Sequence, residues 1–154
     1  MKMVRNARKA VAAGALTALM AIGAASGAQA TSASGTAYFD NGQPITANMW
    51  IQPVSNGGCG SFSSSAVMNV SPNWIRNTTS FYQYGVGSIS IKGVNVSGSG
   101  TSNPATLQWT NSNGARGSYL SGTVCMGWGA FYLGADVAAT AYYYGNLRTA
   151  SARV

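Results

Sequence analysis

Residues 62–70 alternate between two kinds of side chain, and this rhythm constrains the fold more than any other feature of the sequence. One face would carry Phe62, Ser64, Ala66, Met68 and Val70, and the other Ser63, Ser65, Val67 and Asn69. Successive side chains of a β-strand point to opposite faces, so a two-residue period indicates a strand with one buried face. The same period recurs in residues 45–51.

Residues that favour helices are nearly missing. The sequence has no Glu, very little Leu and, after residue 30, a single Lys. Long helices draw on these residue types, whereas the abundant Thr, Val, Tyr, Gly and Asn favour strands joined by tight turns. Candidate strands follow one another at a spacing of roughly ten residues, which is typical of all-β domains. The sequence therefore predicts an all-β fold: a single-domain antiparallel β-sandwich or small barrel.

Residues 1–30 have the three parts of a secretory signal peptide. A basic head precedes an apolar run rich in Ala, Leu and Gly, and Ala28 and Ala30 supply the small residues that a signal peptidase reads. We therefore expect a secreted, extracellular protein that is cleaved after Ala30. The head and the Ala-rich core resemble those of bacterial exported proteins. An N-terminal anchor helix is the alternative, and the short apolar core disfavours it.

Two segments are expected after the predicted cleavage site. Residues 31–44 begin with the small polar sequence TSASGT and contain a turn signal at Asp40-Asn41-Gly42. They are expected to form a flexible N-terminal segment, or one that only a partner orders. Residues 45–154 are expected to form the β-sandwich domain, which is long enough for one hydrophobic core.

Cys59 and Cys125 are the only two cysteines. In an exported protein they are expected to pair, and the bridge would close a loop of 66 residues. Such a bridge stabilises a fold by roughly 4 kcal/mol through the entropy of the unfolded chain. A metal site is not expected, because the sequence has no His and two thiols alone do not complete a tetrahedral shell.

Residues 123–145 form the least polar stretch after residue 30, with Asp136 as its one charge. Their β-branched and aromatic residues predict two strands near the centre of a sheet, separated at Gly134-Ala135-Asp136. The second strand would turn at Gly145-Asn146 into a last strand. The glycines and Asp136 argue against a transmembrane helix, whereas a membrane-inserting hairpin remains an alternative.

A second hairpin is expected upstream of this stretch. Residues 105–109 have a strand pattern, and a partner strand would start near Ser118. The connection between them contains Asn113-Gly114, a strong signal for a tight turn.

The sequence offers few groups for catalysis. It has no His and no Glu, which excludes imidazole bases, Ser-His-Asp triads and common zinc sites. Asp40 and Asp136 lie beside turn residues and are expected to cap those turns. Lys92 lies in a Ser-rich strand and is expected to be solvated, and the two cysteines lack a C-x-x-C spacing. We therefore expect no enzyme activity and no cofactor.

Charge gives no support to nucleic-acid binding. Four basic residues lie in the predicted signal peptide, and the rest of the chain has five cations against two carboxylates, a net charge of +3. These cations are scattered, so they form no stripe that would track a phosphate backbone. They also form no basic helix that would lie on a membrane surface, so a membrane partner is not expected.

Aromatic residues are the strongest positive signal for binding. Three successive tyrosines, 142–144, would alternate between the faces of a strand, so Tyr142 and Tyr144 would share one face. If that face meets solvent, they form a patch that can stack on a sugar or anchor a protein; otherwise they fill the core. Trp50 would lie opposite the apolar face of its strand, and Arg116 at the tip of a polar turn.

These features predict a secreted, non-catalytic binding protein. Its expected role is that of an interaction or adaptor subunit of an extracellular assembly, such as a toxin, adhesin or surface complex, with a protein as its partner. Three alternatives stay open. Arg116 would fit a protease inhibitor, Tyr142 and Tyr144 with an exposed Trp would fit a carbohydrate-binding module, and residues 124–144 would fit a membrane-active β-hairpin toxin.

Overall fold

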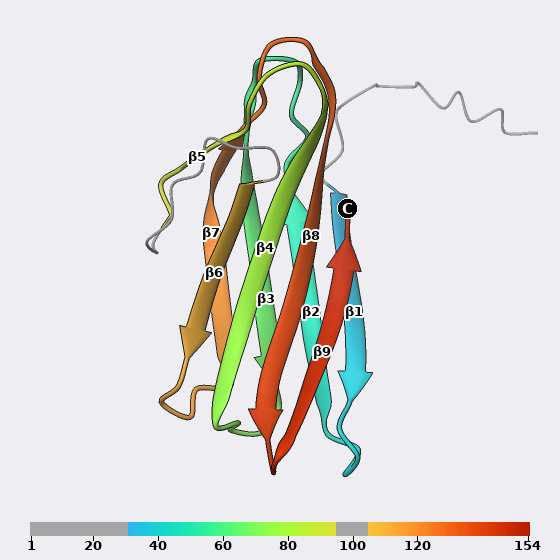
Figure 1. Ribbon diagram of the computed structural model, residues 1–154, viewed down its shortest axis with the longest axis vertical. Helices are drawn as coiled ribbons and strands as arrows, with labels where there is room; N and C mark the ends of the chain where they lie inside the picture. Colours follow the sequence, from blue (N-terminus) through green and yellow to red (C-terminus); the bar gives the residue numbers. More distant parts are fainter. Residues whose placement is uncertain (1–30, 95–104) are drawn as a thin grey trace, which may run out of the picture.

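The computed structural model describes residues 31–94 and 105–154, so the predicted signal peptide lies outside the described residues. The described chain forms strands and no helix (Figure 1). The strands are β1 (Thr31–Tyr38), β2 (Pro44–Ile51), β3 (Cys59–Met68), β4 (Trp74–Gly85), β5 (Ser90–Lys92), β6 (Ala105–Asn111), β7 (Gly117–Cys125), β8 (Ala130–Tyr143) and β9 (Asn146–Arg153). Over this part of the chain there is accordingly no helix with the length and hydropathy to cross a bilayer.

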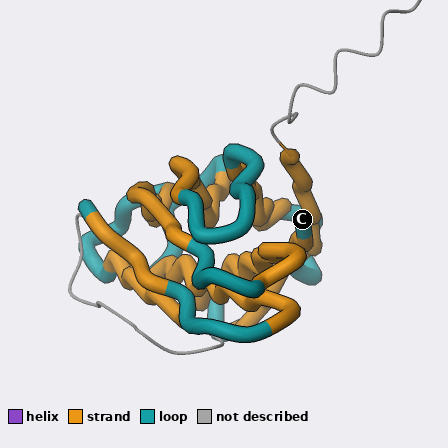
Figure 2. The backbone as a smooth tube through the Cα atoms, turned by 90° about the horizontal axis from the view of Figure 1, so that it is seen from above, coloured by secondary structure: helices purple, strands orange, loops and turns teal. Residues whose placement is uncertain are grey.

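The strands form two antiparallel sheets that face one another as two layers (Figures 1 and 2). One sheet, here called sheet A, has the strand order β1-β2-β3-β7-β5. The other, sheet B, has the order β6-β4-β8-β9. The two sheets remain separate, so the predicted all-β fold is confirmed and takes the form of a β-sandwich.

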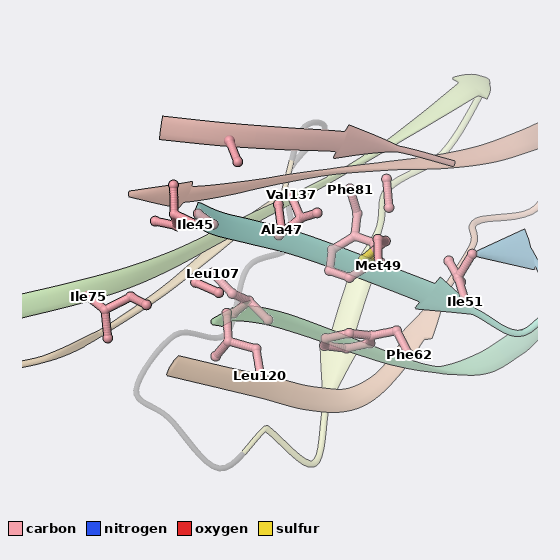
Figure 3. Close-up of a cluster of buried hydrophobic side chains, with 14 of the residues drawn as sticks. Ile45, Ala47, Met49, Ile51, Phe62, Ile75, Phe81, Leu107, Leu120 and Val137 are labelled. Atoms are coloured by element: carbon pink, nitrogen blue, oxygen red, sulfur yellow. The ribbon is translucent and has the colours of Figure 1, made fainter. Parts of the chain in front are cut away.

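Apolar side chains from the inner face of each sheet fill the space between the layers (Figure 3). In β2 the buried residues are those of the predicted apolar face: Ile45, Ala47, Met49 and Ile51. Phe62 of sheet A meets Phe81 of sheet B edge to face, with 4.7 Å between the ring centroids. Burying one such side chain stabilises the fold by roughly 1.5–3 kcal/mol, so this core is the main source of stability.

Residues 31–38 differ from the expected flexible segment. They form β1, which pairs with β2 along its whole length, from Thr31↔Ile51 to Tyr38↔Pro44. The inward positions of β1 are Ala or Gly and the outward ones are mostly Ser or Thr, so the strand alternates as β-strands do but with little hydrophobic contrast. The segment is therefore ordered by the chain's own sheet, and residues 31–38 belong to the sandwich.

Gly35 lets the two sheets approach at one edge of the sandwich. β1 and β9 lie side by side there (Figure 1), and a Cβ atom on Gly35 would overlap the carbonyl oxygen of Ser151.

Replacing Gly35 by Val is expected to lower the free energy of unfolding by about 1–3 kcal/mol, because backbone atoms must move apart. Urea denaturation measures this. Thr36→Val, on the outward face of the same strand, is the control and should change it by at most about 0.5 kcal/mol; equal effects would contradict the close approach.

The connection after β6 does not form the expected hairpin. The turn at Asn113-Gly114 is present, with Gly114 at φ 75°, but β6 belongs to sheet B and β7 to sheet A. The connection therefore crosses from one layer to the other. The side-chain amide of Asn111 donates to the carbonyl of Gly117 (2.6 Å), and the hydroxyl of Ser118 donates to the carbonyl of Trp109 (2.9 Å).

The break within the least polar stretch also lies elsewhere than expected. β7 ends at Cys125 and β8 starts at Ala130, so the chain turns at residues 126–129, and β8 continues without interruption through Gly134-Ala135-Asp136. The expected hairpin between the last two strands is present, but its turn is one residue earlier than predicted: Tyr143 pairs with Asn146, and the turn residues are Tyr144 and Gly145, at φ 48° and 78°.

A buried polar cluster connects the two sheets inside the core. Asn77 and Thr79 of β4 meet Ser64 of β3 and Ser118 of β7, and each is at most 4% exposed. The amide nitrogen of Asn77 donates to Ser64 Oγ (3.0 Å) and to the Ser118 carbonyl (3.4 Å), and its oxygen accepts from Thr79 Oγ1 (3.1 Å). The hydroxyls of Ser64 and Thr79 lie 2.6 Å apart. Because these bonds cross from sheet B to sheet A, they fix how one layer sits on the other.

Candidate functional site

The predicted disulfide between Cys59 and Cys125 is confirmed. The two residues lie opposite each other where β3 begins and β7 ends, so the bridge lies within sheet A. Next to it, the backbone N–H of Met126 donates to the carbonyl of Gly58 (2.9 Å). The disulfide therefore fixes the base of the connection formed by residues 126–129, at the upper end of Figure 1.

Five large apolar side chains gather at this end of the sandwich. They come from the end of β4 with the connection that follows it, and from the β7–β8 connection with the start of β8. Their exposed fractions are large: Tyr84 59%, Val86 76%, Trp128 79%, Phe131 86% and Tyr132 52%. We call these five residues the aromatic end.

The two segments that form the aromatic end are in direct contact. The backbone N–H of Val86 donates to the carbonyl of Gly129 (3.2 Å), and the rings of Tyr84 and Tyr132 lie 6.1 Å apart. Tyr84 also meets Tyr82 edge to face at 5.8 Å. Tyr84 and Tyr132 are cross-strand neighbours on one face of sheet B, whereas Phe131, the preceding residue of β8, points to the opposite face at the same end of the sandwich.

Glycine contacts and hydrogen bonds hold the loop that carries Trp128. The indole packs on Gly57, where a Cβ atom would lie 2.7 Å from the ring. The backbone N–H of Gly129 donates to the side chain of Asn56 (2.8 Å), and that of Gly127 to the side chain of Gln83 (3.1 Å). A loop fixed in this way loses little conformational entropy when a partner binds.

A neutralised ion pair borders the aromatic end. Arg153 Nη2 donates to Asp136 Oδ2 (2.8 Å), and its guanidinium lies 5.8 Å from the centroid of the Tyr82 ring. The hydrogen bond to Asp136 raises the pKa of Arg153, while burial and then the charge of Asp136 raise the pKa of Tyr82. Arg153 therefore stays protonated, Tyr82 stays neutral, and the pair carries no net charge.

Tyr142 and Tyr144 are both exposed, to 38% and 77%, but they do not stack on each other. Tyr142 stacks on Trp74 of β4 at 6.4 Å, with ring planes 14° apart. Tyr144 lies in the turn after β8 with φ 48°, and packs edge to face on Tyr143. The two tyrosines border one open hollow of about 450 Å³, opposite residues 71–73. The alternation expected for residues 142–144 thus ends at Tyr143.

Trp50 lies on the outer face of sheet A and is 38% exposed. Its cross-strand neighbours are Ser32 of β1 and Ser63 of β3, both small, so the indole is bordered by hydroxyl groups on either side. None of the five residues of the aromatic end lines the hollow beside Trp50.

Arg116 has an exposed side chain, but its backbone is fixed. The carbonyl oxygen of Arg116 accepts a hydrogen bond from the backbone N–H of Met68 (2.8 Å). A protease acts on the carbonyl of the residue it recognises, and here that carbonyl is already bonded to the end of β3. This geometry does not favour an inhibitory loop.

The two carboxylates of the chain each form an ion pair and lie far from one another in the sandwich. Asp40 pairs with Arg148, and Asp136 pairs with Arg153. Within residues 31–94 and 105–154, no three residues of the types His, Cys, Asp and Glu come close enough to hold a metal ion. The described residues thus bring together neither a pair of carboxylates nor a set of metal ligands.

No family model matches this chain, and no curated protein sequence matches it. Fold and surface chemistry are therefore the basis for a functional assignment.

The sequence pattern assigned Trp128, Phe131 and Tyr132 to a central strand, so the aromatic end was not predicted as a site. Phe131 and Tyr132 do alternate as strand residues, but they lie beyond the region where sheet A covers sheet B. A usable signal was present, because Gly85, Gly87, Gly127 and Gly129 all flank the large apolar residues. Of these, Gly85, Gly87 and Gly129 have a positive φ, a conformation typical of chain reversals at the surface.

Proposed function

We propose that this protein is a secreted, non-catalytic binding protein, an interaction subunit of an extracellular assembly, whose protein partner docks on the aromatic end. The observation that supports this most is the exposure of five large apolar side chains at one end of the sandwich, on two segments whose loops are held by hydrogen bonds. Tyr, Trp and Phe are enriched at the centres of protein interfaces, and exposed apolar clusters mark interaction sites.

The electrostatic surroundings favour a partner with an uncharged, apolar surface. The five residues carry no charge, and the nearest ion pair, Asp136–Arg153, is neutral as a pair. A charged group of a partner would lose its hydration at this surface without gaining a counterion. The expected partner therefore presents apolar side chains that pack on the exposed side chains of the aromatic end.

The alternatives have less support from the geometry. A membrane-active hairpin of residues 124–144 would have to leave the sheet, although β8 pairs with β4 on one side and with β9 on the other. Removing β8 would expose backbone groups that are now hydrogen-bonded, which is costly in lipid. Protease inhibition is disfavoured by the bonded carbonyl of Arg116.

The test compares the secreted protein with the double variant Trp128→Ser/Phe131→Ser in affinity capture from culture supernatant and cell-surface extract. A protein partner is expected to be retained by the unaltered protein and to bind the variant at least about tenfold more weakly, because exposed aromatic residues at interface centres carry most of the binding energy. Surface substitutions of this kind change stability little, so both proteins should unfold at similar urea concentrations.

The matched control is Tyr119→Ser/Leu147→Ser, which removes two similarly exposed apolar side chains elsewhere. It should capture the partner as the unaltered protein does. Equal capture by all three proteins would overturn the proposal, as would retention on neutral liposomes in place of a protein partner, which would favour a membrane surface.

A further inference from the structure

We propose that the outer face of sheet A binds a neutral glycan, with Trp50 as the residue on which a sugar ring stacks. This site is separate from the aromatic end and does not depend on the function proposed for it. Three features support it: the hollow beside Trp50, the hydrogen-bonding groups around that hollow, and the uncharged side chains on the same face.

Trp50 forms one wall of an open hollow of about 370 Å³ on β1, β2 and β3. The side chains of its floor and rim form two rows of cross-strand neighbours. One row is Ser32, Trp50 and Ser63, and the next is Ser34, Asn48 and Ser65. A pyranose ring has a face of C–H groups and a rim of hydroxyls, so it needs an aromatic face and several hydrogen-bonding groups in its plane. The two rows supply both.

Asn48 orders the hydrogen-bonding groups of the hollow. Its side-chain oxygen accepts from Ser34 Oγ (2.7 Å), and its side-chain nitrogen donates to Ser65 Oγ (3.1 Å). Ser34 therefore has free lone pairs as an acceptor, and Ser65 keeps its own proton as a donor. Sugar hydroxyls both donate and accept, so an ordered donor on one side and an acceptor on the other complement them.

The charge of this face selects a neutral ligand. On β1, β2, β3 and β7, every outward side chain that the structure describes is uncharged at neutral pH, and Ser and Thr predominate among them. The nearest cation within sheet A is Lys92 on β5, three strands from β2, which is about 14 Å across a sheet. That distance exceeds the screening length at physiological salt. An acidic sugar would find no counterion beside Trp50.

Further exposed rings extend the face beyond one sugar. Tyr38 lies at the far end of β1, opposite Pro44, and Trp50 is six positions along β2 from Pro44, or about 20 Å. Tyr119 of β7 lies in the row of Asn48, two strands away. These positions fit an oligosaccharide of several rings better than a monosaccharide.

The test applies the secreted protein to a microarray of neutral oligosaccharides (glucan, mannan, xylan and chitin types) together with uronic-acid and sialylated ones. Retention on at least one neutral class is expected, unaffected by added salt. Trp50→Ala should weaken that binding at least tenfold, equivalent to about 1.4 kcal/mol, and Trp50→Phe should keep part of it. Ser63→Leu, which fills the hollow without changing Trp50, should cause a similar loss.

Two control variants distinguish this site from the exposed aromatic residues elsewhere on the surface. Trp109→Ala removes a comparably exposed indole from β6 in the other sheet, and Trp128→Ser/Phe131→Ser removes the aromatic end. Both should bind the glycan as the unaltered protein does. Binding only to acidic glycans, no binding to any neutral class, or full binding by Trp50→Ala and Ser63→Leu variants that unfold at the normal urea concentration would each overturn the proposal.

Discussion

Replacing both Cys59 and Cys125 by Ala is expected to lower the free energy of unfolding by about 4 kcal/mol. The disulfide joins residues that are 66 positions apart, and without it the unfolded chain gains the entropy of an open loop of that length. Single domains have a total stability of roughly 5–15 kcal/mol, so the loss would be a large share of it. Urea denaturation of the oxidised protein and of the double variant measures the difference.

Reduction of the unaltered protein provides the control for the cysteine variant. Cys59 is exposed, so dithiothreitol can reach the bridge, and the reduced protein should unfold at the same urea concentration as the double variant. The dependence of stability on urea should also become steeper, because the unfolded chain expands when the loop opens. A loss below about 1 kcal/mol in both forms would show that the unfolded chain stays compact without the bridge.

The local elements of the fold were readable from the sequence wherever burial alternates strongly. The positions of β2 and β3 with large apolar residues are those that point into the core, as the two-residue period predicts. β1 was missed because its inward residues are Ala and Gly, whose low hydrophobicity resembles that of a flexible segment. Gly35 is nevertheless required there, since only a residue without Cβ permits the approach of β9.

The connections between strands were less predictable, for a physical reason. A turn signal such as Asn113-Gly114 reports the local backbone, and Gly114 does adopt a positive φ. It does not report whether the next strand returns to the same sheet or crosses to the other. That choice depends on non-local strand pairing, here of β6 with β4 and of β7 with β3, which sequence periodicity does not contain.

The candidate sites show the same limit. Trp50 was identified correctly as an outward residue, because its neighbours Met49 and Ile51 define the buried face of one strand. Trp128 and Phe131 were assigned to a central strand, because periodicity does not reveal where one sheet extends beyond the other. Whether a side chain at the end of a sandwich is exposed depends on how both sheets are arranged. The exposure of the aromatic end is therefore not readable from the pattern of one strand.

Replacing Asn77 by Leu is expected to destabilise the protein by about 2–4 kcal/mol, although Leu resembles Asn in shape and is far more hydrophobic. Asn77 is fully buried and is the common partner of Ser64, Thr79 and the carbonyl of Ser118. Leu would leave polar groups of both sheets without their hydrogen bonds in the core, and each such loss costs about 1–3 kcal/mol. Urea denaturation at neutral pH measures the change.

The matched control for Asn77 is Gln108→Leu, which removes an exposed amide from the adjacent strand β6. Its contact with Thr78 is long (3.4 Å) and solvated, so its loss should change stability by at most about 0.5 kcal/mol. The triple variant Asn77→Leu/Ser64→Ala/Thr79→Val, which removes the polar side chains together, should regain part of the stability. If Asn77→Leu matched Gln108→Leu, the polar cluster would not join the sheets, and the apolar core alone would set how they pack.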